Sequence, residues 1–297
     1  MSIAGGLPLA IERARVHGCD ALQIFTKSSG QWRARPLPAE EIAAFRDRAR
    51  ATGIQPIVAH ASYLINVAAA NPLLRARSVA ALEEEMDRAD TLGLFGVVLH
   101  PGARTTSSEE QALDLVATAL AHILASHSHR QTMVLLEHTA GQGSSVGHTF
   151  EQIAAIIERL GGEPRVGVCL DTCHLLASGY DLRSEQGYRA TFETFSRLVG
   201  LERLKVFHLN DSKKPCGSRV DRHEHIGRGC LGLEPFRRLV NDARFAHLPM
   251  LIETQKSDAR ERLRIVVDPL DEMNLRTLRS LMEKVERSSQ WPQALPT

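Results

Sequence analysis

Short apolar runs, separated by longer amphipathic segments, extend from Ala21 to Thr254. The short runs are typical of strands buried in a parallel sheet, and the longer segments have the periodicity of helices. The apolar runs predict strands over 21–26, 55–60, 96–100, 132–138, 165–171, 204–210 and 250–254. The segments between them predict helices that begin near Pro38 and cover about 72–92, 108–125, 149–160 and 187–199. Thr149 and Gln152 have the spacing of a capping box.

The alternation of strand and helix predicts parallel βαβ units and, at this chain length, the α/β architecture of a TIM (β/α)8 barrel. A closed barrel of this type has eight strands, whereas the pattern supplies seven. The residues before Gly5 are too few for a full strand, so we expect either that the first strand is truncated or that the barrel is open on that side. No linker or change of composition divides the chain, so residues 1–285 are expected to form one domain, followed by a polar tail over 286–297.

Six of the expected strands end in a side chain that can bind a metal ion. These residues are His60, His100, Glu137, Asp171, His208 and Glu253. The C-terminal strand ends of such a barrel converge on one face, where carboxylates and imidazoles would be costly to bury without a neutralising partner. Nitrogen and oxygen donors without thiolates suit zinc, manganese or iron. The strand ends therefore predict a metal centre at this face.

Further candidate ligands follow the strands, with His174 in a loop after 165–171 and with Asp221 and His223 in a loop after 204–210. The nine candidates exceed the needs of one ion, so we expect a multinuclear site with bridging carboxylates. Two metal ions ~3.5–4 Å apart can stabilise both the attacking and the leaving oxygen of a displacement at phosphorus. The ligand set therefore favours hydrolysis of a phosphate ester.

The formal net charge of +1 argues only weakly against binding to nucleic acid. Divalent ions at the centre would outweigh its four ligand carboxylates. Loops expected at the same end of the barrel carry Lys27, Arg33, Arg35, Lys213, Lys214, Arg219, Arg222 and Arg228. A near-neutral chain can in this way present a basic face to a polyanion.

The chain has no apolar run long enough to span a bilayer, and its first residues lack the basic and apolar regions of a signal peptide. The five cysteines are too few and too scattered for a disulfide framework, and Cys169 and Cys173 are expected to be structural thiols. We therefore expect a cytoplasmic protein that does not associate with membranes.

Several other polar residues have plainer expected roles. His122, His127 and His129 lie at a helix end and in a polar loop, and are expected on the solvated surface. His138 and His225 flank candidate ligands and are expected either to support them or to be exposed. The acidic run 83–85 is expected to be a solvated helix face.

Six segments resemble, in the same order, the motifs of the endonuclease IV family of apurinic/apyrimidinic endonucleases. They are HASYLIN (60–66), LHPG (99–102), EHTAGQG (137–143), VGVCLDTCH (166–174), HLNDSK (208–213) and GSRVDRHEHIG (217–227). The resemblance extends from about Ala4 to Glu253 and implies a TIM barrel that holds three zinc ions. It also implies that the protein cleaves the phosphodiester 5′ of an abasic site in double-stranded DNA, leaving a 3′-hydroxyl and a 5′-deoxyribose phosphate, and removes blocking groups from 3′ ends.

The resemblance assigns the candidate ligands to three zinc ions. His60, His100 and Glu137 would hold the first ion, and Glu137 would bridge to a second ion that Asp171, His208 and Glu253 complete. His174, Asp221 and His223 would hold the third. Glu137 would be catalytic as the bridge between ions that activate the attacking hydroxide. We expect the chain to act as a monomer.

The resemblance also suggests how DNA is held. Tyr63 and Leu64 match residues that the family inserts into the damaged duplex, and Gly30 stands where the family has an inserting arginine. Lys27, Arg33 and Arg222 are expected to contact DNA.

Three other functions stay open at this point. A metal-dependent sugar isomerase or epimerase also places His, Glu and Asp at the strand ends of a similar barrel, but has little use for Asp221 and His223. A protein that binds abasic DNA without cutting it would result if the truncated strand disrupted the barrel. A phosphoesterase acting on small esters would not need Tyr63 and Leu64 to wedge a duplex apart.

Overall fold

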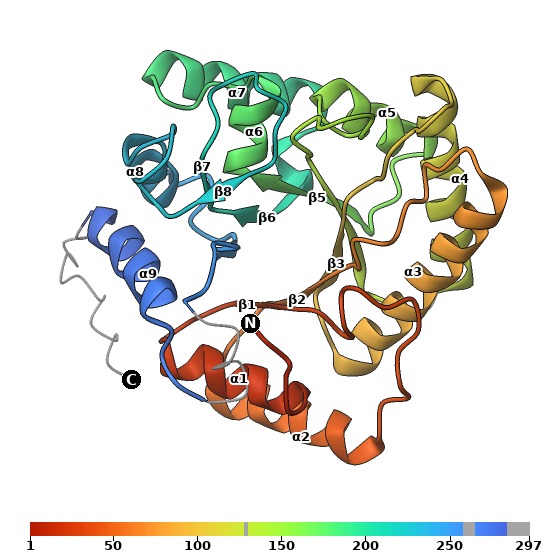
Figure 1. The fold of residues 1–297 in the computed structure, drawn as a ribbon, viewed down its shortest axis with the longest axis horizontal. Coiled ribbons are helices and arrows are strands. Elements are labelled where there is room, and N and C mark those ends of the chain that lie inside the picture. Colours follow the sequence, from red (N-terminus) through yellow and green to blue (C-terminus); the bar gives the residue numbers. More distant parts are fainter. Residues whose placement is uncertain (128–129, 258–264, 284–297) are drawn as a thin grey trace, which may run out of the picture.

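The computed structural model describes residues 1–127, 130–257 and 265–283. Its main sheet has seven parallel strands in the order β1–β2–β3–β4–β5–β6–β9. Their bounds are β1 Leu22–Ile24, β2 Ile57–His60, β3 Gly96–Leu99, β4 Met133–Glu137, β5 Val166–Asp171, β6 Leu204–His208 and β9 Met250–Leu251. The sheet curves into a nearly closed barrel with the helices on its outside (Figure 1). The predicted TIM barrel fold is confirmed, with the seven strands that the sequence pattern supplies.

The helices are α1 Leu7–Val16, α2 Ala39–Thr52, α3 Pro72–Leu92, α4 Glu109–Ser126, α5 Phe150–Arg159, α6 Thr172–Ser178, α7 Glu185–Leu198, α8 Glu234–Asn241 and α9 Pro269–Leu281, with a short 3-10 helix over Leu201–Arg203. The sequence pattern does not predict α1, α6, α8 or α9. Because α6 follows β5 directly, His174 lies in the first turn of a helix, and the prediction that it starts a loop is wrong. A two-stranded antiparallel ladder of β7 (Asp211–Ser212) and β8 (His223–Glu224) lies after β6.

Side-chain caps mark where several helices begin. Ser108 and Gln111 form a reciprocal capping box at the start of α4. At the start of α5, Thr149 accepts a hydrogen bond from the backbone N–H of Gln152, as expected. Oε1 of Gln152, however, accepts from the N–H groups of Gly147 and His148, so the capping box predicted there is only half formed.

A small apolar core fills the barrel below its mouth. It consists of Val58, Val98, Leu135, Cys169, Val206 and Leu251. Each of these residues lies two positions before a candidate ligand, and residues two apart on a strand point to the same side. A larger core, which includes Phe150, Phe195 and Phe207, lies between the sheet and the helices. The inner core therefore lies beneath the strand-end side chains and fixes the direction in which they point.

The edge strands of the sheet, β1 and β9, are not paired with each other in the part of the chain that the structure describes. A cavity of about 1300 Å³ lies along this seam, lined by residues of both strands, by Met1–Ala4 and by one face of α9. The amino group of Met1 donates a hydrogen bond to the backbone oxygen of Gln23 on β1. The barrel is therefore interrupted on the side where the sequence pattern lacks a strand.

No helix within the described ranges is both long and apolar enough to cross a membrane. The polar tail expected over 286–297 and the expected surface residue His129 lie outside the described residues.

Candidate metal centre

Glu137 lies at the end of β4, fully buried at the centre of the barrel mouth. Its Oε2 is 3.1 Å from Nε2 of His60 and 2.9 Å from Nε2 of His100. Its Oε1 is 3.0 Å from Nδ1 of His208. These three histidines come from the ends of different strands, so the barrel brings residues that are far apart in sequence around one carboxylate. The donor atoms of His60, His100 and Glu137 all lie within 4.8 Å of one another, close enough to share an ion.

A second group of donors lies on the other side of Glu137. Glu137, Asp171, His208 and Glu253 each offer a ligand atom within 4.8 Å of the others. Nδ1 of His208 is 3.1 Å from Oε2 of Glu253 and 3.9 Å from Oδ2 of Asp171. Glu137 belongs to both groups, which is the position that a bridging carboxylate occupies between two ions.

The third group comes from residues outside the main sheet. Nε2 of His174 on α6 is 3.2 Å from Oδ2 of Asp221, and Nε2 of His223 on β8 is 3.2 Å from Oδ1 of the same residue. Asp171 joins this group to the second one, since its Oδ2 is 3.6 Å from Nε2 of His223. The structure thus brings together all nine ligand candidates that the sequence supplies.

Hydrogen bonds to backbone carbonyls fix the orientation of three of the imidazoles. Nδ1 of His60 lies 2.7 Å from the oxygen of Ala61, and Nδ1 of His174 lies 2.9 Å from the oxygen of His138. Nδ1 of His223 faces the oxygen of Glu253 at 3.3 Å. In each ring the Nδ1–H donates to the carbonyl, so Nε2 is left to face the carboxylates and can bind a metal.

His208 has the opposite orientation. Its Nδ1 faces Glu137, and its Nε2–H donates to Oε1 of Gln23 at 2.8 Å. Asp171 is also held by two bonds, since Oδ1 accepts from the backbone N–H of His174 and Oδ2 accepts from Nδ2 of Asn210 at 2.6 Å. The first of these bonds makes Asp171 the N-cap of α6.

The donor set fits divalent cations. Among the described residues, Nε2 of His174 and Nε2 of His223 are buried side-chain atoms without a hydrogen-bond partner, although both lie near Asp221. A buried imidazole nitrogen without a partner is costly, and two that face one carboxylate are satisfied together by a cation. We interpret this arrangement as a metal site.

The charges of the centre agree with this interpretation. Burial opposes ionisation of Glu137, but His100 and His208 lower its pKa well below the usual value. Burial likewise opposes the charged forms of His223 and Glu253, yet Asp171 raises the pKa of His223 to about 9 and His208 lowers the pKa of Glu253 to about 2. Protons on the imidazoles thus balance the carboxylates, and metal ions would displace those protons while supplying the same charge.

Two thiols lie close enough to be considered as ligands. Cys169 lies near Glu137 and His208, and Cys173 lies near Asp221 and His223. Burial raises the pKa of each thiol to about 12. A protonated thiol is a poor ligand, so nitrogen and oxygen donors are the better set. Both cysteines are buried, as expected of structural thiols.

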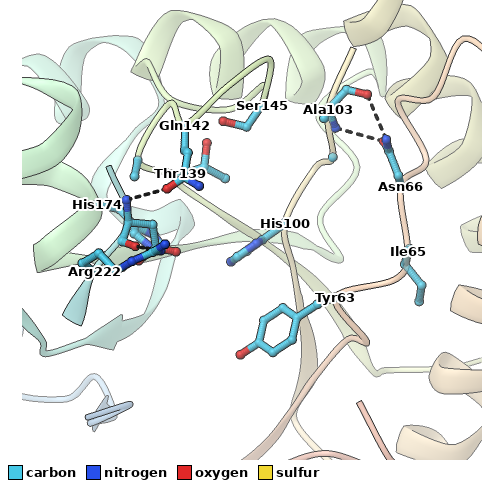
Figure 2. Close-up of a pocket in the computed structure, with 13 residues that line it drawn as sticks. Tyr63, Ile65, Asn66, His100, Ala103, Thr139, Gln142, Ser145, His174 and Arg222 are labelled. Atoms are coloured by element: carbon cyan, nitrogen blue, oxygen red, sulfur yellow. Dashed lines mark hydrogen bonds and ion pairs between the residues drawn. The ribbon is translucent and has the colours of Figure 1, made fainter. Parts of the chain in front are cut away.

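A cavity of about 330 Å³ opens beside the centre. Figure 2 shows Tyr63 and His100 on one side of it and His174 with Arg222 on another. Asn66 holds one wall of the cavity in place by two hydrogen bonds. Its Oδ1 accepts from the N–H of Ala103 at 2.9 Å, and its Nδ2 donates to the oxygen of Ala103 at 3.0 Å. Gly102 is required there, since a Cβ atom at this position would lie 2.3 Å from Oδ1 of Asn66. The cavity is therefore a pocket beside the candidate metal centre, with one wall held by the hydrogen bonds of Asn66.

The residues expected to contact DNA differ in exposure. Tyr63 is 61% exposed at the mouth, with its ring 5.1 Å from that of His60. Arg33 and Arg222 are exposed and Leu64 is half-buried. Lys27 is different, because its side chain is only 3% exposed and Nζ lies 3.4 Å from both Glu84 and Glu85. The prediction that Lys27 contacts DNA is therefore wrong, since a buried and paired ammonium group cannot reach a phosphate.

Two expectations for surface residues are also corrected. His127 is buried, with Nε2 3.0 Å from Asp87 and Nδ1 2.7 Å from the oxygen of Ile123, whereas His122 is exposed as expected. Glu85 is buried as well, so the acidic run on α3 is not simply a solvated face. His138 is fully buried, and its carbonyl oxygen supports His174.

Sequence reasoning missed Gln23, which lies on the inward side of β1 and contacts two of the candidate ligands. The available signal was a polar residue at an alternating position between Ala21 and Phe25 in an otherwise apolar strand.

Comparisons with known proteins agree with the geometry. A family model described as a xylose isomerase-like TIM barrel, of the AP endonuclease 2 group, matches residues 11–281. A probable endonuclease 4 of Chloroflexus aurantiacus is 49% identical over 286 residues, covering 96% of this chain and 98% of the relative. A probable endonuclease 4 of Geobacter sulfurreducens is 48% identical over 284 residues, covering 96% of this chain and 93% of the relative.

Solved structures give the same result. The crystal structure of endonuclease IV from Thermus thermophilus matches with a TM-score of 0.81 and 37% identity, covering 95% of this chain and 96% of that one. A D-psicose 3-epimerase matches with a TM-score of 0.66 but only 15% identity, which is a likeness of fold alone. On this evidence the chain belongs to the endonuclease IV family.

Proposed function

We propose that this protein is a zinc-dependent apurinic/apyrimidinic endonuclease that hydrolyses the phosphodiester 5′ of an abasic site in duplex DNA, leaving a 3′-hydroxyl and a 5′-deoxyribose phosphate. The observation that carries the proposal is the grouping of nine donors around two shared carboxylates, Glu137 and Asp171. The same proposal includes trimming of blocked 3′ ends, action as a monomer and a cytoplasmic location, as the family resemblance implies.

Three ions would be held as the resemblance assigns them. His60, His100 and Glu137 would hold one zinc ion, Glu137, Asp171, His208 and Glu253 a second, and His174, Asp221 and His223 a third. Zinc bound there would supply a nucleophile by lowering the pKa of water and would neutralise charge on the phosphate oxygens. Carboxylates and imidazoles that have lost their extra proton are the ligand types that would bind such ions.

The protein's own residues would orient the substrate. Tyr63 projects from the loop after β2 beside the centre, and Arg222 lies exposed next to Asp221 at the opposite wall of the pocket (Figure 2). An exposed aromatic ring can fill the space left by a displaced nucleotide, and an exposed guanidinium can pair with phosphate. The pocket between them is where the abasic deoxyribose would lie.

The test is a nicking assay on a duplex that contains one abasic-site analogue, with the metal content of the same preparation counted. We expect about three zinc ions per chain and a single cut 5′ of the lesion. Glu137→Gln should lower kcat/KM on the order of 1,000-fold or more, because the two zinc sites that share Glu137 would both lose a negatively charged ligand. Glu193→Gln, an exposed glutamate on α7, is the matched control and should leave the rate unchanged. A cut on duplex DNA by Glu137→Gln at the rate of the unaltered protein would refute the proposal.

A further inference from the structure

Gln23 is the one residue of β1 whose side chain contacts candidate ligands of the centre in the described structure. It lies between Leu22 and Ile24, both buried, and is itself half-buried at the seam between β1 and β9. Its side chain reaches across that seam to His208 at the end of β6 and to Glu253 beyond β9. No backbone hydrogen bond joins β1 to β9 among the described residues, so this side chain links the two edges of the sheet at the mouth.

The contact with His208 needs a hydrogen-bond acceptor and the contact with Glu253 needs a donor, and the side-chain amide of Gln23 has both. Oε1 of Gln23 accepts from Nε2–H of His208 at 2.8 Å, and Nε2 of Gln23 donates to Oε1 of Glu253 at 2.5 Å. The carboxylate can only accept, so the amide orientation is fixed, and the ring of His208 must carry a hydrogen on Nε2. An imidazole that donates from Nε2 presents its Nδ1 to a metal.

His208 needs such a partner because its geometry is inverted. His60, His174 and His223 each donate from Nδ1 to a backbone carbonyl that their own strand or a neighbouring loop provides. His208 instead turns Nδ1 towards Glu137 at 3.0 Å and Glu253 at 3.1 Å. Among the described residues, the partner that reaches its Nε2 is a side chain from the other edge of the barrel.

We propose that Gln23 is a positioning residue of the metal centre, which holds His208 in the tautomer that binds through Nδ1 and turns the carboxylate of Glu253 towards the same ion. This inference rests on the proposed metal-dependent function. Its consequence is that the affinity of the second ion depends on a contact made across the open seam of the barrel. Hydrogen-bonding partners of metal ligands are typically worth ~10–100-fold in metal affinity.

The test compares Gln23→Leu and Gln23→Glu with Gln186→Leu, a matched control at an exposed position on α7. Gln23→Leu removes both hydrogen bonds while keeping a similar volume. Gln23→Glu keeps an acceptor for His208 but sets a carboxylate against that of Glu253. Zinc affinity is measured by competition with a chromogenic chelator, in the absence of DNA, and the ring nitrogen shifts of His208 are measured by NMR.

We expect one ion per chain to be released ~10–100-fold more readily in both Gln23 variants and not in the control. In Gln23→Leu the ring nitrogens of His208 should lose the signature of a single tautomer, and kcat should fall while KM for duplex DNA is kept. Unchanged zinc affinity and an unchanged His208 tautomer in Gln23→Leu would overturn the inference.

The failure of this inference can be told apart from failure of the proposed function. If the unaltered protein binds zinc and cuts DNA, but the Gln23 variants match it, only the positioning role is lost. If the unaltered protein binds no zinc, the proposed function fails, and the positioning role fails with it. If Gln23→Leu does not fold, Gln23→Glu decides through the contact to Glu253, because it keeps the shape and the acceptor for His208 but loses the donor to Glu253. Unchanged zinc affinity in Gln23→Glu would then overturn the inference.

Discussion

Replacing Lys27 by Met should destabilise the protein, because the carboxylate of Glu85 then stays buried without its counterion. Nζ of Lys27 donates to the oxygen of Trp32 at 2.9 Å and lies 3.4 Å from Glu85 on α3, whose side chain is 1% exposed. Oε1 of Glu85 in turn accepts from the backbone N–H of Ser62, next to Tyr63. The buried pair thus fastens the loop after β1 and the loop after β2 to the same helix.

The expected loss is about 3 kcal/mol of unfolding free energy. Breaking a buried ion pair by removing one partner costs ~3–5 kcal/mol, because the other charge stays buried without its counterion. The lower end applies here, since Glu85 keeps its bond to Ser62. The ion pair of Lys27 with Glu84 contributes little to the unfolding free energy, because the side chain of Glu84 is 36% exposed and water screens the contact.

The loss should also depend on pH. Burial raises the pKa of Glu85 above its usual value of 4.5, and Lys27 opposes that rise, so the pKa climbs further in Lys27→Met. A carboxyl group whose pKa is higher in the folded than in the unfolded protein destabilises the fold when it is ionised. The destabilisation grows as the pH rises from the unfolded pKa to the folded pKa. This cost disappears as the pH falls below the unfolded value of about 4.5. The difference between variant and unaltered protein should therefore shrink from about pH 7 to about pH 4.5.

The assay is urea denaturation of the metal-free protein at several pH values, in a double-mutant cycle with Glu85→Gln. The double variant should recover ~2 kcal/mol relative to Lys27→Met, since no charge is then left buried. Lys213→Met, at an exposed position, is the control and should change stability by less than ~0.5 kcal/mol. A loss below ~1 kcal/mol, or a loss that does not vary with pH, would contradict the reasoning.

Two further predictions concern the loops that this pair holds. Tyr63→Ala should raise KM for abasic duplex DNA about tenfold, the order of one lost stacking contact, and leave hydrolysis of bis(p-nitrophenyl) phosphate unchanged; an equal loss on both substrates would place Tyr63 in the chemistry instead. Gly30→Arg should leave stability within ~0.5 kcal/mol, because Gly30 is exposed and a Cβ atom there meets nothing within 4 Å. The added cation should tighten binding to duplex DNA and steepen its logarithmic salt dependence by ~0.9, as a filter-binding titration would show, and weaker binding would count against this.

Much of the barrel could be predicted because the metal-binding residues at the strand ends follow the same two-residue alternation as the apolar residues inside the barrel. Val58 and His60, or Leu135 and Glu137, are two residues apart, so an apolar side chain in the barrel and a donor at its mouth follow from one pattern. The same alternation did not reveal the role of Gln23, because its two partners, at the end of β6 and just beyond β9, are far from it in the sequence.

What the sequence could not supply are contacts set by tertiary packing. Lys27 stands in a polar loop and is expected in solvent, but Glu85, which buries it, lies on α3. α6 has only seven residues, too few for a periodic signal, and begins because Asp171 caps it. His127 follows a helix end, where exposure is the usual outcome, yet its side chain is buried and contacts Asp87 of α3.

The residues that favour a nuclease over another barrel enzyme lie outside the seven-stranded sheet. The epimerase barrels show that this fold is shared widely, and any such barrel gathers its strand-end residues at one mouth. His60, His100 and Glu137 therefore indicate that a metal can bind, but they do not indicate which bond of a substrate is broken. The additional group comes from α6, from β8 and from the loop between β7 and β8, which bring His174, His223 and Asp221 together. His174 and Asp221 also line the pocket. His174, Asp221 and His223 would hold a third ion, which would supply additional stabilisation of negative charge during phosphodiester hydrolysis, a need that proton transfer between sugar carbons does not have.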